Sequence, residues 1–262
     1  MKQKPSLPGG FHDYLPEREG KRRAMCKSVE DAFLQFGFLP LSTPAVEHTE
    51  LITGGEESFE KQIFTLGGGE LALRPEHTLP LARVIAMHPE IKKPAKLYSI
   101  GPLWRGERQQ AGRFKEFVQA DADIVGSGSM LADAEMLLLA HQIMKNLGIK
   151  DSVLHISHRK LANGVMRFAK IPKAEQVGVL RAMDKFGRDG WEGVEKELKK
   201  LGVDAERRKI LKKFITLSGK PGSVMKKLEE LFGSAKEAND GLNELREIIG
   251  YLDKFALPGR AW

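Results

Sequence analysis

Hydrophobic residues recur along the chain at two spacings, one typical of helices and one typical of strands. Between residues 18 and 36 the apolar positions fall three or four apart, which predicts a helix that Gly37 ends. The same spacing predicts helices over 78–87, 130–147 and 160–168, and Thr78 is the expected N-cap of the first of these. Short apolar runs bounded by glycine and proline predict strands over 38–41, 62–66, 70–73, 120–125 and 153–157.

Three consecutive glycines, 67–69, separate two of the predicted strands. A glycine run can also cradle phosphates, but a phosphate-binding loop needs a lysine followed by serine or threonine, and none follows here. We therefore interpret the run as the turn of a β-hairpin, where glycine supplies the positive φ angles that tight turns require.

A second hairpin, over residues 98–123, carries the residues best suited to chemistry. Arginines 105 and 113 lie at its mouth, and a guanidinium grips phosphate oxygens through two parallel hydrogen bonds. Phe117 is placed to stack on a purine. Because side chains alternate along a strand, Gln119, Asp121 and Asp123 share one face that suits a small cationic or polar substrate. The alternative is a solvated hairpin with charged edges.

From about residue 171 to residue 250 the sequence becomes charged, lysine-rich and helical in its spacing, which predicts a small helical domain. Its basic residues are candidates for contacts with nucleic-acid phosphates: Lys199, Lys200, Arg208, Lys212 and Lys213. The equally weighted alternative is a solvated helical surface, because runs of charge usually form one.

Composition agrees with a polyanionic partner without requiring one. Among 262 residues, 42 lysines and arginines outnumber 35 aspartates and glutamates, so the net charge is +7. Cys26 is the single cysteine, which excludes an intramolecular disulfide and a cysteine zinc site. The chain has no apolar run of membrane-spanning length and no secretory leader pattern, so we expect no membrane association and a cytoplasmic location.

The second hairpin closely resembles motif 2 of class II aminoacyl-tRNA synthetases, in the form typical of histidyl-tRNA synthetase. The family pattern is roughly F-R-x-E-R-P-Q-x-G-R-x-R-E-F-x-Q. Nine positions match it: Arg105, Glu107, Arg108, Gln110, Gly112, Arg113, Glu116, Phe117 and Gln119. The departures are mild: Trp104 replaces phenylalanine, Gln109 replaces proline and Lys115 replaces arginine.

Three more segments resemble the same family, in the same order along the chain. Residues 8–16 resemble its P-x-G-x-x-D-x-x-P opening, and residues 37–47 resemble motif 1, which builds the dimer interface in class II enzymes. Residues 73–78, followed by Arg83, resemble the L-R-P-E-x-T segment that contacts the histidine substrate. One such string would be weak, but four in order form a strong signal.

The resemblance implies an α+β fold, with an antiparallel sheet flanked by helices and a small all-α insertion. The implied domains are a catalytic core over 1–170, a helical insertion over 171–250 and a truncated return to the core over 251–262. The implied activity is histidine–tRNA ligation, in which histidine and ATP form histidyl-adenylate and the acyl group then passes to tRNA(His). The partners expected are histidine, ATP with Mg²⁺, tRNA(His) and a second copy of the chain, with Pro44 in the homodimer interface.

The resemblance also implies roles for individual residues. Arg105 would be the catalytic arginine at the α-phosphate, while Glu107, Arg113 and Phe117 would complete the ATP site. The histidine site would consist of Glu76, Thr78, Gln119 and Asp123. The family usually has glutamate at the last position, so Asp123 is shorter by one methylene. For Glu76 the alternative role is that of an acidic residue stabilised by a helix N-terminus. No protein metal ligands are implied.

Two further family segments are not found in this sequence: the R-G-L-D-Y-Y-T-G strand and motif 3. We therefore expect the C-terminal strands of the sheet to be missing and hold three interpretations. The first and favoured one is an N-terminal portion of a histidyl-tRNA synthetase; whether this portion is active alone is left open. The second is a non-catalytic paralogue, such as the regulatory subunit of ATP phosphoribosyltransferase. The third is a fragment that dimerises or binds tRNA.

Overall fold

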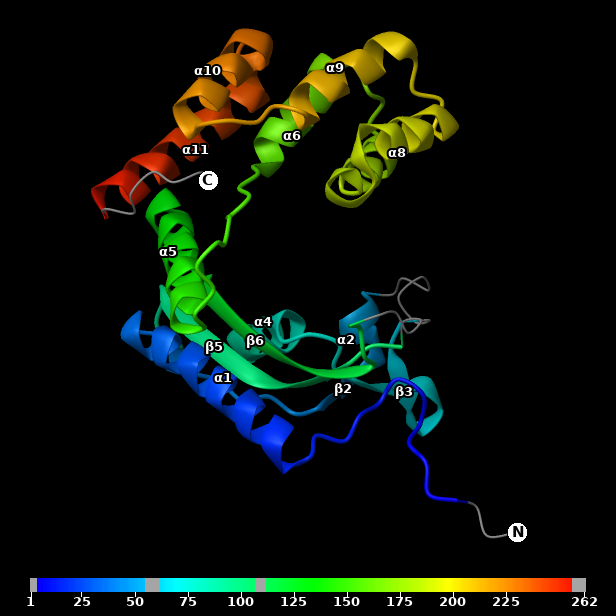
Figure 1. Cartoon of the computed structure of the whole chain (residues 1–262), viewed down its shortest axis with the longest axis vertical. Coiled ribbons are helices and arrows are strands. Elements are labelled where there is room, and N and C mark those ends of the chain that lie inside the picture. Colours follow the sequence, from blue (N-terminus) through cyan, green and yellow to red (C-terminus); the bar gives the residue numbers. More distant parts are fainter. Residues whose placement is uncertain (1–3, 55–61, 107–111, 256–262) are drawn as a thin grey trace. The chain divides into compact units, whose positions relative to one another are not determined.

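The computed structural model describes residues 4–54, 62–106 and 112–255 (Figure 1). The chain divides into two compact units. The first comprises the chain up to Gly128 together with Leu139–Lys150, and the second comprises Ser129–Leu138 and the chain from Asp151 onward. The helix α5 (Met130–Asn146) is thus divided between the two.

The first unit is built from strands with helices packed beside them (Figure 1). Its strands are β1 (Leu39–Pro40), β2 (Val46–His48), β3 (Phe64–Leu66), β4 (Leu71–Leu73), β5 (Ala95–Trp104) and β6 (Glu116–Val125). Its helical segments are α1 (Pro16–Gln35), α2 (Thr49–Thr53), the 3₁₀ turn η1 (Gly67–Gly69) and α4 (Thr78–Met87).

Among the described residues the strands form one mixed sheet and one antiparallel sheet, each of three strands. In one, β5 lies between β1, which is parallel to it, and β6, which is antiparallel. In the other, β4 lies between β2 and β3 and is antiparallel to both. The ten-residue ladder of β5 and β6 is the longest pairing and provides the face on which the candidate site is built.

Helix α1 packs on the first sheet through a small aromatic cluster. Ala32 and Phe33 are its buried residues, and the Phe33 ring centroid lies 5.0 Å from that of Tyr98 on β5. The Tyr98 hydroxyl donates to Glu30 at 2.9 Å, so the buried ring keeps a partner for its polar end. Pro16 begins the helix, where its missing N–H costs no hydrogen bond.

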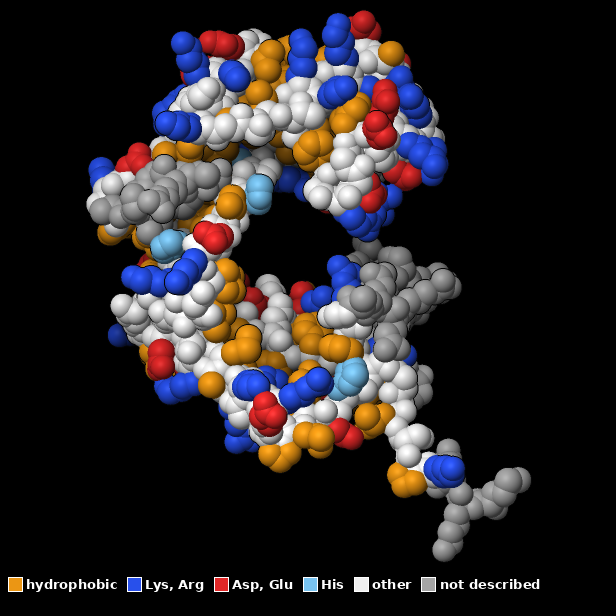
Figure 2. All heavy atoms as spheres, in the orientation of Figure 1, with side chains coloured by type: hydrophobic (Ala, Val, Ile, Leu, Met, Phe, Trp, Pro, Cys, Tyr) orange, Lys and Arg blue, Asp and Glu red, His pale blue; other side chains and the backbone are white. Residues whose placement is uncertain are grey.

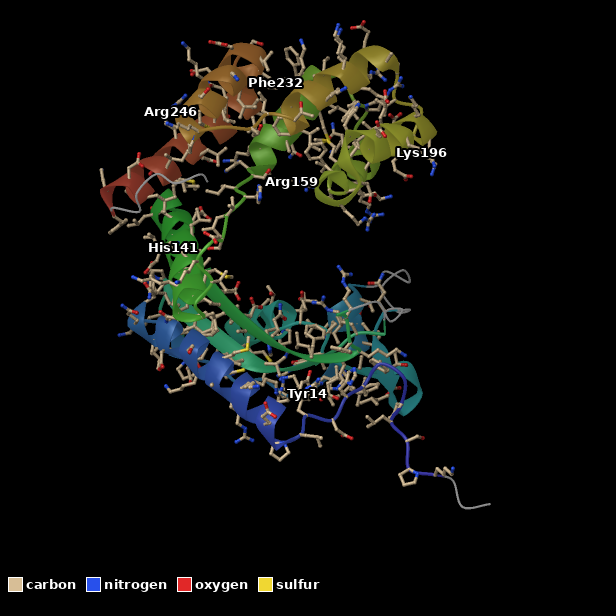
Figure 3. The ribbon with its side chains drawn as sticks, in the orientation of Figure 1. Tyr14, His141, Arg159, Lys196, Phe232 and Arg246 are labelled. Atoms are coloured by element: carbon tan, nitrogen blue, oxygen red, sulfur yellow. The ribbon has the colours of Figure 1, made fainter. Side chains whose placement is uncertain are left out.

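The second unit is a set of packed helices (Figure 1). They are α6 (Arg159–Phe168), α7 (Gln176–Met183), α8 (Phe186–Lys200), α9 (Ala205–Ile215), α10 (Pro221–Phe232) and α11 (Lys236–Lys254). One core joins them, and Phe232 of α10, labelled in Figure 3, contacts the rings of Phe168 and Phe214 edge to face within it. Amphipathic helical spacing is what allows every helix to contribute to this core.

Helices α6 and α11 approach especially closely because each has a glycine at the contact. A methyl group on Gly164 would lie 2.3 Å from the backbone nitrogen of Ala238, and one on Gly241 would lie 2.6 Å from that of Leu161. Neither distance is possible for a real side chain, so glycine is required at both positions. An ion pair flanks the contact, between Arg167 of α6 and Glu237 of α11 at 2.9 Å.

Most of the elements expected from the sequence are present. The helices over 18–36, 78–87, 130–147 and 160–168 correspond to α1, α4, α5 and α6, and the glycine run forms the turn between β3 and β4. The α+β class expected is confirmed. The division at residues 170 and 250 stays a prediction; by its contacts α6 belongs to the helical unit.

The strand expected over 153–157 is wrong. These residues have no regular secondary structure, and Val153 is about half exposed. Alternating apolar residues specify a strand only where a partner strand is available. Among the described residues no strand pairs with this segment, and Ile156 packs instead against the helical core.

Candidate active site

The loop between β4 and α4 is anchored by a buried arginine. Arg74 is 7% exposed, and its Nη1 donates to the carbonyl of Thr43 at 2.6 Å and to that of Pro44 at 3.3 Å. Its Nε and Nη2 both donate to the carbonyl of Pro102 at 3.3 Å. Burial lowers the pKa of Arg74 from its ordinary value. Five donors on one planar group thus fix the loop to two neighbouring segments.

Across from this loop, β6 presents its polar residues on one face, as the alternation predicts. Gln119, Asp121 and Asp123 pair in register with Gly101, Ser99 and Leu97 of β5. Directly opposed residues of a ladder project to the same side of the sheet. Gly101 and Ser99, which oppose Gln119 and Asp121, are small, whereas Leu97 opposes Asp123.

The loop and the sheet face meet at Thr78. Its hydroxyl donates to Oδ2 of Asp121 at 3.3 Å. Thr78 is not the N-cap expected from the sequence: it is the first helical residue, and the Glu76 carboxylate accepts from the Leu79 N–H at 3.1 Å instead. The expectation was wrong because α4 already includes Thr78, so the N-cap position falls to His77, whose side chain makes no capping hydrogen bond.

Three carboxylates gather at this point and affect one another electrostatically. Burial raises the pKa of Asp123, and the like charges of Asp121 and Glu76 raise it further. Crowded carboxylates without a cation are unfavourable. The arrangement suits a bound cationic group, such as the ammonium group of an amino acid.

Arg105 lies at the end of β5, beside the same loop. Its Nε donates to the carbonyl of Pro75 at 2.9 Å, and its guanidinium carbon lies 5.1 Å from the centre of the Phe117 ring. These two contacts fix the plane of the guanidinium. Phe117, expected to stack on a purine, therefore uses one contact to hold Arg105, and its stacking on a base stays a prediction.

The remaining expected site residues are placed as follows. Arg113 and Pro44 are exposed, and the carbonyl of Pro44 accepts from Arg74. Glu107 lies outside the described residues, as do Arg108 and Gln110. The structure thus brings Glu76, Thr78, Gln119 and Asp123 together on one face of β5 and β6, with Arg105 at the edge of the loop.

Sequence reasoning gave no individual role to Arg83 or His77, and it placed Asp121 on the substrate face without its partner Thr78. Arg83 forms a two-bond pair with the buried Glu47, at 2.7 and 2.8 Å, which fixes α4 to β2. His77 is buried, yet neither ring nitrogen has a partner within hydrogen-bonding geometry. Asp121 binds Thr78. A spacing of 36 residues between Glu47 and Arg83 gives no local signal that could have found their pair.

In the helical unit, lysines and arginines cover much of α8, α9 and α10 (Figure 2). Several of them are already paired: Lys199 with Glu195 at 3.4 Å, Lys200 with Glu197 at 2.8 Å, and Lys212 with the Trp191 ring at 5.5 Å. Arg208 donates to the carbonyl of Val203. Lys196, labelled in Figure 3, is exposed on α8.

Within the described parts of the chain, no three or more His, Cys, Asp or Glu side chains are grouped so as to hold a metal ion. None of the described helices is long and apolar enough to cross a membrane.

Comparison with known proteins gives the family. The profile of the family described as Histidyl-tRNA synthetase matches residues 10–260. A histidine–tRNA ligase from Clostridium tetani is 37% identical over 98% of this chain, and one from Aeropyrum pernix is 36% identical over 95%. The chain belongs to the histidyl-tRNA synthetase family of aminoacyl-tRNA synthetases.

Solved structures agree with the fold. The histidyl-tRNA synthetase of Nostoc sp. PCC 7120 superposes with a TM-score of 0.87 at 27% identity, covering 99% of this chain and 60% of the Nostoc chain. A Bacillus halodurans protein described as an ATP phosphoribosyltransferase regulatory subunit/histidyl-tRNA synthetase superposes with a TM-score of 0.82 at 21% identity, a likeness of fold alone. The chain spans about 60% of the length of the curated relatives it matches.

Proposed function

We propose that this chain carries the histidine- and ATP-binding part of a histidine–tRNA ligase, which forms histidyl-adenylate and transfers the acyl group to tRNA(His). The family match supports the class of reaction. One observation carries the site: the carbonyl of Pro75 accepts from Arg105, which joins the candidate phosphate-binding arginine to the loop that carries Glu76 and Thr78. Both substrates must meet at such a junction for a carboxylate to attack a phosphate.

In this proposal the carboxylate face binds the amino acid. Glu76 and Asp123 hold the cationic and polar ends of histidine, with Thr78 and Gln119 beside them. The raised pKa of Asp123 supports this assignment, because a bound cation would relieve the crowding of the carboxylates. The shorter side chain of Asp123 leaves more room for the ligand than glutamate would.

Arg105 neutralises the α-phosphate of ATP, and Glu107, Arg113 and Phe117 complete the nucleotide site. Preorganised charge at the developing pentacoordinate phosphate is the main means by which such a site lowers the barrier. Mg²⁺ would come with the nucleotide, since it commonly binds phosphate oxygens and water with few protein ligands. Its chemistry there would be to neutralise phosphate charge.

The helical unit would contact tRNA through its basic surface. Its exposed lysines on α8 and α9 support the proposal, although the pairs already formed with Glu195 and Glu197 reduce the charge available. The protein would work in the cytoplasm, where tRNA is charged. It would act as a homodimer through the segment that contains Pro44.

The test is histidine-dependent exchange of pyrophosphate into ATP, measured with the purified chain and Mg²⁺. We expect exchange above background, and Arg105→Ala should reduce it by about 10³-fold, because an electrostatic contact at the reacting phosphate is lost. Arg167→Ala, which removes an exposed arginine of α6, is the matched control and should leave the rate unchanged. Exchange that survives Arg105→Ala would refute the role assigned to this arginine.

The regulatory paralogue remains the second candidate, because the Bacillus halodurans structure shares the fold. Such a subunit would bind histidine without using ATP. The position of Arg105 against Pro75 favours the ligase instead. Calorimetry with ATP and Mg²⁺ separates the two: saturable binding supports the ligase, and histidine binding without ATP binding supports the paralogue.

A further inference from the structure

His77 lies between the anchored loop and the sheet. It is 3% exposed, and its buried ring nitrogens lie near the backbone of Gly101 and Gln119 without well-formed hydrogen bonds. Leaving two buried polar atoms unpaired is costly, so such a group in a folded protein requires an explanation. Its neighbours in sequence are the two loop residues assigned to the amino acid, Glu76 and Thr78.

The His77 ring lies against Gly101, and Arg74 approaches the same glycine more closely. A methyl group at Gly101 would lie 3.6 Å from Cε1 of His77 and 3.0 Å from Nη2 of Arg74. Gly101 pairs with Gln119 in the ladder, so the ring lies over the middle of the hairpin. Glycine inside a strand weakens it, and its presence commonly marks a close approach of another group.

We propose that His77 is a positioning residue of the amino-acid site: its ring fills the space above Gly101 and sets the distance of Glu76 and Thr78 from the carboxylates of β6. The inference rests on the proposed function. Because the ring packs against the backbone of the sheet, it keeps the loop at a fixed distance from β6. At this distance the Thr78 hydroxyl donates to Asp121 at 3.3 Å.

The charge of the His77 ring affects the hydrogen bond between Thr78 and Asp121. Burial lowers the pKa of His77, and Arg74 from the end of β4 lowers it further. Asp121 on β6 acts in the opposite direction, as does the backbone of Gly101 and Gln119. A protonated ring would attract Asp121, which would weaken the hydrogen bond from Thr78. The lowered pKa favours the neutral ring, which leaves Asp121 available to Thr78.

The experiment is calorimetry with histidine and, separately, with ATP and Mg²⁺, at pH 7.5. His77→Ala, which removes the ring, should weaken histidine binding about tenfold, because Glu76 and Thr78 lose the group that sets their distance from β6. ATP binding should change less than twofold. His77→Met, which fills much of the same space, should recover most of the loss. His88→Gln, at the exposed histidine that follows the other end of α4, is the matched control.

If His77→Ala does not fold, His77→Val tests the same geometry, because it leaves most of the space of the ring empty. It should weaken histidine binding more than ATP binding.

The possible failures are distinguishable. A wild-type chain that binds ATP but not histidine would overturn the proposed function, and this inference with it. A wild-type chain that binds histidine, with His77→Ala binding it equally well, would overturn the inference alone. Equal losses of histidine and ATP affinity would assign His77 to the general packing of the loop.

Discussion

Glu76 combines two interactions that substitution can separate. Its carboxylate accepts from the Leu79 N–H at the start of α4, and in the proposed site it binds the ammonium group of histidine. Glu76→Ala removes both, so we expect a loss of about 1 kcal/mol in the free energy of unfolding, as for other helix caps, and a loss of histidine affinity of about tenfold or more. Urea denaturation and calorimetry measure the two effects.

Glu76→Gln is the matched variant, because an amide oxygen can still accept from Leu79. It should restore most of the stability while histidine affinity remains low. If Glu76→Gln binds histidine as the wild type does, the carboxylate serves the helix only. Equal losses of histidine and ATP binding would lead to the same conclusion.

The ionised side chain of Asp123 should lower the free energy of unfolding while it contributes to ligand binding. Burial and the charges of Asp121 and Glu76 raise its pKa in the folded chain, so folding favours the protonated form. At neutral pH the ionised group is therefore destabilising. Asp123→Asn should raise the free energy of unfolding at pH 7 by roughly 0.5 kcal/mol, the low end for stabilising substitutions, and should weaken histidine binding.

The raised pKa of Asp123 also determines how the stability difference between the wild type and Asp123→Asn changes with pH. As pH falls from 7 through the folded-state pKa, the wild type gains stability relative to Asp123→Asn, so the difference between them should narrow. Denaturation at pH 7 and pH 4.5 measures it. Asp133→Asn, at an exposed position of α5, is the control and should change stability by less than about 0.5 kcal/mol at either pH. A difference that widens toward low pH would contradict the assignment.

At the scale of elements, the contact between α6 and α11 depends on glycine. Gly241→Ala would place a methyl group 2.6 Å from the backbone nitrogen of Leu161, which forces the helices apart. We expect a loss of about 1–3 kcal/mol, the usual cost of overpacking, measured by thermal or urea unfolding.

Gly250→Ala on the same helix is the matched control. Nothing lies within 4 Å of a methyl group there, so the higher helix propensity of alanine should stabilise the chain by up to about 1 kcal/mol. If both variants are stabilised, the helices do not pack as closely as the structure shows.

At the scale of the whole molecule, the proposed homodimer has a candidate surface on the first unit. Large apolar side chains there are exposed, among them Met25 and Leu34 on α1 and Leu39 on β1, at 57%, 48% and 64%. Hydrophobic side chains lie among the charged ones over α1 in Figure 2. Exposed apolar surface of this kind commonly marks an interface.

Sedimentation at increasing concentration should show a dimer, and Leu39→Glu should shift it to monomer, because a carboxylate would be buried without a partner. Leu201→Glu, at an exposed leucine of the helical unit, should leave the dimer intact. A wild-type chain that stays monomeric at high concentration would contradict the homodimer for this chain.

The sequence by itself determined the helices with strong periodicity, the glycine turn and the polar face of β6. These depend on interactions between residues close in sequence, where period and turn chemistry carry the information. The motif around Arg105 also identified the family before any contact was known, because order and spacing of whole segments are specific where single residues are not.

Tertiary structure alone decided which distant groups meet. Arg105 and Pro75 are 30 residues apart, and Arg83 and Glu47 are 36 apart, so no local pattern links them. The segment 153–157 alternates like a strand but stays unpaired among the described residues, because a ladder needs a partner elsewhere in the chain. The burial of His77 above Gly101 likewise exists only once loop and sheet have packed together.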